Sequence, residues 1–226
     1  MQSPPERIEN TGISDAYHRG EMSPAATPSS ATSKPRRVRK SPDTRRTELV
    51  HAACKVFEDL GYGDTGFADV AAEAKVSKAL LYHYFPDGRP QLFVQVTQAV
   101  LADFVERLHN AAKAPFSART RMEHLLGALF AFFDDNPQAY RILFRDPWVA
   151  QDESVEAAAI ATRVQLASEM ASVMAPSGLP TDELLIASTG LLGFALANVE
   201  LCLAGQVVAE TAWRITCTYA VAQFPE

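Results

Sequence analysis

Apolar residues recur at steps of three and four along most of the chain beyond residue 43. In the segment 43–60 this spacing places one set of side chains on a single helical face: Leu49, Ala52, Ala53, Val56, Phe57 and Leu60. Ser41 or Asp43 can cap the start of this helix, and Gly61 can end it. The pattern predicts an amphipathic helix with one face against a core.

Two shorter helices are predicted directly afterwards, over 67–74 and 77–84. The inward-facing residues would be Phe67, Val70, Ala71 and Ala74 on the first and Leu81 and Phe85 on the second. Ser77 is a natural N-cap for the second helix, and Val76 would fill the turn before it. The small side chain of Ala71 lets the two helices cross at a steep angle, so the segment is predicted to form a helix-turn-helix.

The remainder of the chain is rich in Ala and Leu and is punctuated by Pro and Gly, without the alternation expected of strands. Further helices are predicted near 90–112, 118–135, 137–147, 152–174, 181–204 and 208–223. Pro90, Pro137 and Pro180 lie at or near helix starts, where the missing N–H of proline costs little. The predicted fold class is therefore all-α, with about nine helices.

Composition divides the chain into three parts. Residues 1–33 are rich in Pro, Ser, Ala and Thr and have no apolar period, which indicates disorder. We expect a disordered arm over 1–42 that is basic at 34–40, a helix-turn-helix domain over 43–89, and a helical domain over 90–226. Met22 follows a stretch with no apparent structural purpose and is an alternative start of translation.

The net charge of −6 is unevenly distributed along the chain. Residues 34–90 carry 11 basic and 8 acidic residues, whereas residues 91–226 carry 8 and 15. A basic front on an acidic body attracts phosphate on one side only. The basic run 34–40 is either a solvated tail or an arm that contacts phosphates or a minor groove.

Other function classes find little support. Cys54, Cys202 and Cys217 form no CxxC pair, which argues against a disulfide framework or zinc site. The chain has no Gly-rich phosphate loop, GxSxG or HExxH motif, and its histidines are scattered. We therefore expect no catalytic residue, metal or cofactor. No apolar run reaches about 18 residues and no signal peptide is evident, so a cytoplasmic protein is expected.

The second helix of the helix-turn-helix has an outward face that a purely structural role does not explain. It carries Lys78, Ala79, Tyr82 and His83, with Tyr84 near its edge. Lysine and tyrosine reach phosphates, and tyrosine and histidine also reach base edges or a thymine methyl group. The face predicts contact with double-stranded DNA.

Residues 44–93 resemble the DNA-binding domain of the tetracycline-repressor (TetR) family of bacterial regulators. The resemblance is carried by residues that match in order: Ala53, Val56, Phe57, Gly61, Tyr62, Thr65, Asp69, Val70, Ala71, Val76, Ser77, Lys78, Leu81, Tyr82, His83, Tyr84 and Phe85. Several spaced matches over about fifty residues are far more specific than a lone motif. The later helices agree with the family in number and length but not in a diagnostic sequence.

The resemblance implies roles at matching positions. Residues that would face the major groove are Lys78, Ala79, Tyr82, His83 and Tyr84. Thr65 would touch the DNA backbone and Arg89 would hold a phosphate, while Arg45 and Arg46 complete the expected DNA-binding set. Three features depart from the family pattern: Lys75 replaces a turn glycine, Gly66 replaces a capping Ser or Thr, and Pro86–Pro90 is one residue longer, which leaves the role of Arg89 open.

The family also implies a body that pairs two subunits. The predicted helix 181–204 is apolar around most of its circumference, as a helix buried on all sides must be. The expected dimer contacts are Gly190, Gly193, Phe194, Ala197 and Trp213. A central core helix in a monomer remains the alternative. A two-fold dimer would pair two reading helices with two half-sites.

An aromatic segment in the body offers candidates for a ligand cavity. The residues are Phe130, Phe133, Tyr140, Phe144 and Trp148, together with Asn198, a polar residue in an apolar helix. Aromatic residues at helical spacing equally suit a packed core.

These observations favour a sequence-specific transcriptional regulator, a homodimeric repressor released from a palindromic operator by an unknown small-molecule effector, with no membrane partner. An all-helical carrier or enzyme with a vestigial helix-turn-helix is the alternative, and an adaptor that uses the basic tail is a third interpretation.

Overall fold

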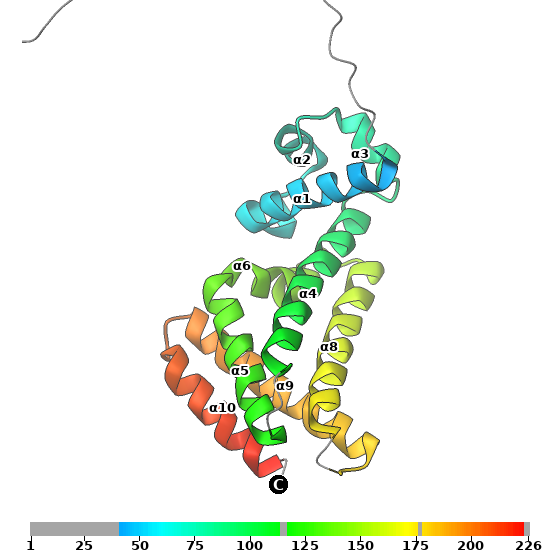
Figure 1. The fold of residues 1–226 in the computed structure, drawn as a ribbon. Helices are drawn as coiled ribbons and strands as arrows, with labels where there is room; N and C mark the ends of the chain where they lie inside the picture. The colour runs from blue at the N-terminus through cyan, green and yellow to red at the C-terminus, as the bar shows by residue number, and fades with distance from the viewer. Residues whose placement is uncertain (1–40, 114–116, 176–177, 224–226) are drawn as a thin grey trace, which may run out of the picture. The chain divides into compact units, whose positions relative to one another are not determined.

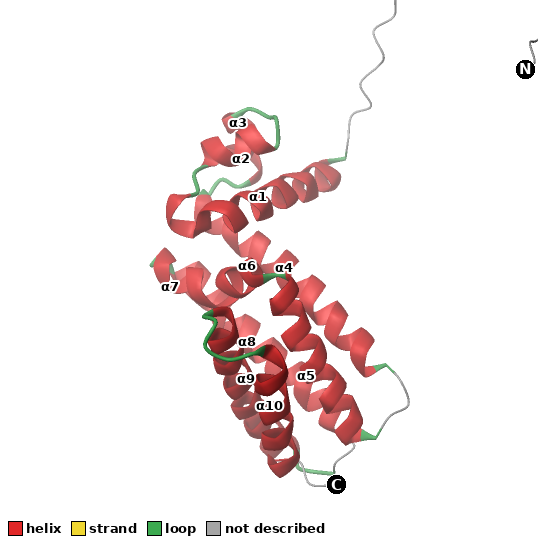
Figure 2. Ribbon diagram, turned by 90° about the vertical axis from the view of Figure 1, so that its left-hand side faces the viewer, coloured by secondary structure: helices red, strands yellow, loops and turns green. Residues whose placement is uncertain are grey.

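All secondary structure in the described residues is helical (Figures 1 and 2). A computed structural model describes residues 41–113, 117–175 and 178–223. Most of the expected N-terminal arm, including the basic run 34–40 and Met22, lies outside the described residues. The predicted all-α class is confirmed, and the predicted helices agree with the observed ones to within a few residues.

Helix α1 (Pro42–Asp64) begins as its sequence predicts, because the Ser41 side chain accepts a hydrogen bond from the Thr44 N–H at 3.1 Å. Its regular part ends at Gly61, where φ is 77° and the backbone leaves the helical conformation. A residue with a Cβ is strained at such an angle, which is why glycine suits this kink.

Helices α2 (Phe67–Glu73) and α3 (Lys78–Tyr84) follow α1 and form the expected helix-turn-helix. Leu81, Phe57 and Phe85 are fully buried at the centre of this unit. The rings of Phe57, Tyr62 and Phe93 meet within 6.2 Å of one another. These ring contacts join α1 to the helix that follows α3, which contains Phe93.

Helix α4 (Arg89–Ala112) contributes to two hydrophobic cores in succession. Phe93 and Val96, in its first half, pack in the helix-turn-helix core, whereas Phe104 and Leu108 pack in the core of the body. The predicted domain boundary lies between residues 89 and 90. The first two turns of α4, which follow it, therefore pack in the core of the helix-turn-helix. The division into domains stays a prediction.

The body contains the remaining helices. These are α5 (Ala118–Asp135), α6 (Pro137–Tyr140), the π-helical turn η1 (Arg141–Arg145), α7 (Asp146–Ala150), α8 (Glu153–Met174), α9 (Thr181–Leu203) and α10 (Ala209–Gln223). Helix α9 packs against α8 and α10, and α5 packs against α4 and α10, so the long helices lie side by side (Figure 2).

Helix α9 bears on the expectation that no apolar segment is long enough to cross a membrane. Within the described residues it is the one helix that is long and apolar enough to cross a membrane, with a mean hydropathy of 1.7. It nevertheless packs against two neighbouring helices, and the core helix of a globular protein meets the same criterion. Length and composition alone therefore do not exclude a membrane span, but a single such helix is weak evidence of one.

Candidate nucleic-acid interface

The outward face of α3 presents a mixture of polar and aromatic side chains to solvent. Ser77 caps the helix, because its hydroxyl accepts a hydrogen bond from the Leu80 N–H at 3.3 Å. Leu81 is fully buried and anchors the opposite face. As the sequence predicts, Lys78, Ala79, Tyr82 and His83 are exposed and Tyr84 is half-buried.

The aromatic side chains on this face are held by ring contacts. Tyr82 is 50% exposed, and its ring packs on Phe67 of α2 with centroids 4.8 Å apart. The Lys78 ammonium lies 5.9 Å from the Tyr82 ring, and His83 meets Tyr84 edge to face. These contacts leave the Tyr82 edge in solvent while they limit its rotamers, so part of the entropy cost of binding is already met.

Arg89 does not point away from the protein as a phosphate contact would. Its Nη1 donates to the carbonyl oxygens of Tyr62, Gly63 and Thr65 at 3.1–3.2 Å, and its guanidinium lies 4.3 Å from the Tyr62 ring. The carbonyls at the end of a helix have no partner within it, and Arg89 satisfies them from α4. It links the end of α1 and the turn after it to α4.

Two other residues expected at the DNA also have partners inside the protein. Thr65 is 1% exposed, and its hydroxyl donates to the Gly61 carbonyl at 2.6 Å. Arg46 donates to the Tyr84 carbonyl at 3.1 Å and stacks over Phe85. The geometry therefore gives both residues a structural role. Arg45 forms an ion pair with Glu48 at 3.0 Å and is half-buried.

The turn between α2 and α3 shows how the departures from the family pattern are accommodated. Lys75 adopts a left-handed conformation with φ of 54°, as expected at a position where glycine is usual. Gly66 offers no side chain to cap α2, but its own N–H donates to the Asp69 carboxylate at 2.9 Å. Asp69 was expected only as a match to the family pattern and not as a cap, although an acidic residue three positions after a helix cap is a recognisable signature.

A polar link that no sequence pattern predicts joins the body to α1. Arg141 of η1 donates to the carbonyl oxygens of Phe57 and Glu58 at 2.6 and 2.8 Å. Asp146 accepts from the Tyr62 N–H at 3.0 Å; burial raises the pKa of this carboxyl, and the bond from Tyr62 and the charge of Arg141 oppose that rise. Residues 84 positions apart carry no local pattern that would reveal this contact.

The residues proposed to line a ligand cavity do not gather around one space. Phe133, Tyr140 and Phe144 are buried and contact one another in the body core. Phe130 is also buried, but it lies beside a different hollow, between α5 and α10. Trp148 is 56% exposed on α7, and the Asn198 amide donates to the Thr216 hydroxyl between α9 and α10.

The residues expected at a dimer interface fall into two groups. Gly190, Gly193 and Ala197 are exposed along one stripe of α9, and Phe194 beside them contacts the Tyr219 ring of α10 at 4.6 Å. Trp213 lies elsewhere: its indole N–H donates to the Glu123 carbonyl of α5 at 3.4 Å. The first four residues share a surface, whereas Trp213 faces the groove between α5 and α10.

A three-helix unit whose second motif helix presents lysine, tyrosine and histidine to solvent defines a helix-turn-helix DNA-binding protein. Residues 49–96 match the family model of the bacterial regulatory proteins of the tetR family. The helix-turn-helix domain of this chain belongs to this family, and the chain is a DNA-binding transcriptional regulator.

Curated relatives support the same class. The transcriptional activator FasR of Mycolicibacterium smegmatis is 28% identical over 82% of this chain and 81% of its own length. The regulator HbdR of Aromatoleum sp. is 30% identical over 55% of this chain and 52% of its own length. The repressor KstR2 of Mycolicibacterium smegmatis is 29% identical over 46% and 50%, so the last two alignments span about half of each relative.

Solved structures share the fold. A TetR-like regulator from Rhodococcus sp. RHA1 superposes with a TM-score of 0.63 at 22% identity, covering 83% of this chain and all of the other. A regulator of the TetR family from Mesorhizobium loti gives a TM-score of 0.66 at 18% identity, covering 82% and 97%. These superpositions show that the chain shares its arrangement of helices with these structures in the body as well as in the helix-turn-helix.

Proposed function

We propose that this regulator binds a pseudo-palindromic operator as a homodimer in the cytoplasm, and that a small-molecule effector bound by the helical body lowers its affinity for DNA. The observation that carries the proposal is the exposed face of α3. Lys78, Ala79, Tyr82 and His83 project from a helix that is fixed from behind by the buried Leu81. Such a helix fits the major groove, where bases differ most in their hydrogen-bonding groups.

The surface of α9 and α10 supports the dimer. Gly190, Gly193 and Ala197 are exposed and small enough to let a second helix approach closely. Large apolar side chains are exposed on the same two helices, among them Ile186, Leu201 and Ile215. Exposed apolar surface of this extent is unusual on a monomer. A two-fold axis through this face would pair two copies of α3 with two half-sites.

The contacts between α1 and the body can transmit the effect of effector binding to the helix-turn-helix. Helix α4 belongs to both cores, and Arg141 and Asp146 tie η1 and α7 to the end of α1. An effector that favours one tilt of α4 would change the spacing of the two α3 helices in a dimer. The ligand acts by binding one spacing more tightly than the other.

The proposed sign of regulation is repression, in which the dimer occupies its operator until the effector releases it. Activation is a second candidate because FasR, which is named as an activator, aligns with the largest share of this chain among the relatives described above. KstR2, over a shorter alignment, is named as a repressor. A reporter gene placed behind the operator distinguishes the two: deletion of the regulator raises expression under repression and lowers it under activation.

Selection from randomised duplex DNA followed by sequencing tests the proposal. We expect the wild type to enrich a palindrome and Tyr82→Ala to lose or relax it at the bases that Tyr82 contacts. Trp148→Ala serves as a matched control, because Trp148 is a similarly exposed aromatic residue on α7. No enriched motif for the wild type, or equal motifs for wild type and Tyr82→Ala, would contradict the assignment of α3 as the reading helix.

A further inference from the structure

A groove between α5 and α10 has no role in the mechanism described above. Two hollows, of about 320 and 210 Å³, lie along it and share the side chain of Trp213. The indole N–H donates to the Glu123 carbonyl, and Gly127 faces the same nitrogen without a side chain. The indole is thus held in place but remains 36% exposed, so it offers an aromatic wall to a ligand in the groove.

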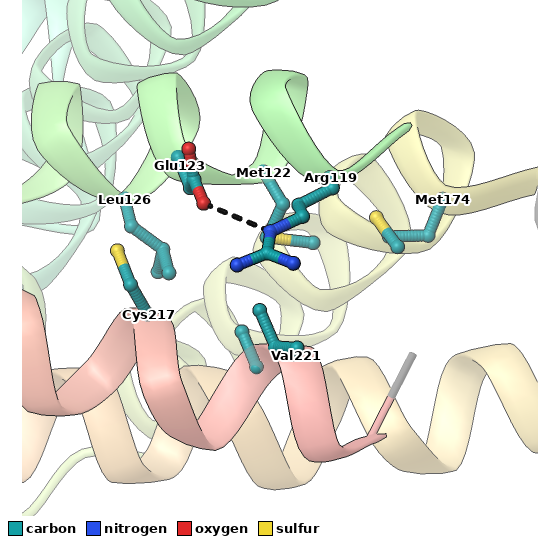
Figure 3. A pocket seen from close by; sticks show the side chains of 8 residues that line it. Arg119, Met122, Glu123, Leu126, Met174, Cys217 and Val221 are labelled. Carbon is teal, nitrogen blue, oxygen red and sulfur yellow. Dashed lines mark hydrogen bonds and ion pairs between the residues drawn. The ribbon is translucent and has the colours of Figure 1, made fainter. Parts of the chain in front are cut away.

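An inner pocket adjoins the larger hollow, and both are lined by Cys217 and Val221 of α10. Figure 3 shows its apolar walls, which include Met122 and Leu126 of α5 and Met174 at the end of α8. The free space inside is only about 10 Å³. Methionine side chains are unbranched and change rotamer readily, so this pocket can widen to admit an alkyl chain.

The outer hollow is bordered by two arginine residues and one carboxylate. Arg119 pairs with Glu123 through Nε at 3.3 Å, and Figure 3 shows its two terminal nitrogens on the side of α10. Within the described part of the chain, the Arg214 guanidinium has no hydrogen-bond or ion-pair partner. The border therefore has an excess of positive charge and free donors for an anion.

We propose that this groove binds an organic anion with an apolar tail, whose head group lies between Arg119 and Arg214 and whose tail passes Trp213 and Cys217 toward Met122 and Met174. All the walls come from one chain, and a hollow of about 320 Å³ is within the size range of small-molecule sites. The site is separate from the aromatic core formed by Phe133, Tyr140 and Phe144. Its role as the effector site rests on the proposed function; binding itself does not.

Tryptophan fluorescence of the full chain tests the proposal. The chain has two tryptophans, so Trp148→Phe leaves Trp213 as the only indole. We expect decanoate, titrated well below the concentration at which it forms micelles, to change the emission of Trp148→Phe saturably. Decanol, which has the same chain without charge, is expected to bind at least about tenfold more weakly because the charge-assisted hydrogen bonds are lost. A Trp213→Phe protein should show little change in the emission of Trp148.

Arginine variants in the same background identify the head-group site. Arg214→Ala should raise the dissociation constant of decanoate about tenfold, because one charge-assisted contact is lost. Arg163→Ala, which removes an exposed arginine from α8, should leave it unchanged and serves as the control. No saturable change in Trp148→Phe, or equal affinity in the Arg119→Ala/Arg214→Ala double variant, overturns the proposal.

Shielding of Cys217 gives a second measurement that does not depend on fluorescence. Burial raises the pKa of this thiol to about 11, so alkylation is slow and is followed at alkaline pH with Cys54 and Cys202 replaced by alanine. We expect decanoate to slow the alkylation of Cys217 further. An unchanged rate at saturating decanoate would contradict a tail that passes this residue.

Operator binding in the same samples separates this proposal from the proposed function. If the ligand-free protein selects a palindrome but decanoate neither binds nor shields Cys217, the groove proposal fails alone. If decanoate binds as expected but the protein shows no DNA preference, the proposed function fails and the binding site stands.

Discussion

Arg89 is the residue with the most backbone contacts at the junction between the helix-turn-helix and α4. One guanidinium nitrogen donates to three carbonyl oxygens, those of Tyr62, Gly63 and Thr65, and the group stacks on the Tyr62 ring. The last carbonyls of a helix and the turn after it have no internal partners. A single fixed cation therefore holds the kinked end of α1 against the start of α4.

Replacement of Arg89 by alanine is expected to lower the free energy of unfolding by about 2 kcal/mol, because partly buried carbonyls lose a charged donor. Urea denaturation measures the change. Arg45→Ala, which removes a surface ion pair, is the control and should shift the free energy of unfolding by less than about 0.5 kcal/mol. An Arg89→Ala protein with unchanged stability but weakened DNA binding would instead assign Arg89 to a phosphate.

Replacement of Lys75 by glycine is expected to raise the free energy of unfolding instead of lowering it. Its φ of 54° is unfavourable for a residue with a Cβ, and glycine relieves that strain. Lys75→Gly should therefore raise the free energy of unfolding by about 0.5–1 kcal/mol, as measured by urea denaturation. Lys75→Ala retains the Cβ and should show no gain, and a stabilising Lys75→Ala would refute the role of backbone strain.

At the scale of the element, α8 depends on its N-cap. The Asp152 carboxylate accepts from the backbone N–H groups of Ser154 and Val155 at 3.0 and 3.3 Å and also from the Ser154 hydroxyl. Chiefly because of the bond from that hydroxyl, and also through the backbone bonds, the pKa of Asp152 is lowered. The charge also lies at the positive end of the helix dipole.

Asp152→Ala should lower the free energy of unfolding by about 1 kcal/mol at neutral pH. Because the folded-state pKa is the lower one, the electrostatic part of this contribution is present above the unfolded pKa and is lost as the pH falls through the folded value. Urea denaturation at pH 7 and at pH 3 therefore should show a smaller difference between variant and wild type at pH 3. A difference that grows on acidification would show that the charge of Asp152 does not stabilise α8.

At the scale of the whole molecule, function as proposed requires two copies of the chain. The exposed stripe of Gly190, Gly193 and Ala197 on α9 is the surface that such a dimer would bury. Ala197→Glu would place a carboxylate in a close helix contact, where it would be desolvated without a partner. The variant should be monomeric at micromolar concentration by light scattering after gel filtration and should lose affinity for a two-half-site operator.

Ala157→Glu on the exposed face of α8 is the matched control for that substitution, since it adds the same charge outside the α9 stripe. It should leave both the oligomeric state and the operator affinity unchanged. A wild-type chain that is already monomeric, or an Ala197→Glu protein that remains dimeric, would place the interface elsewhere or remove it.

The helices themselves follow from local pattern. The three- and four-residue spacing of apolar positions predicts α1 and α5, and prolines at helix starts predict where α4 and α6 begin. Ser77 and Gly61 mark the boundaries near which α3 begins and the regular part of α1 ends, because capping and left-handed turns depend on residues a few positions apart. The exposed face of α3 could be predicted for the same reason: its inner face is fixed by Leu81.

Local sequence pattern is thus sufficient for the helices, the helix-turn-helix, and the set of side chains on the outer face of α3. The partners of long polar side chains depend on how the helices pack. Arg46, Arg89 and Arg141 each bind backbone carbonyls of residues 24 or more positions away, among them those of Tyr84, Tyr62 and Phe57 at separations of 38, 27 and 84 residues. A guanidinium can reach a phosphate or a carbonyl equally well, and only the packing of α1 against α4 and η1 determines which acceptor lies within its reach.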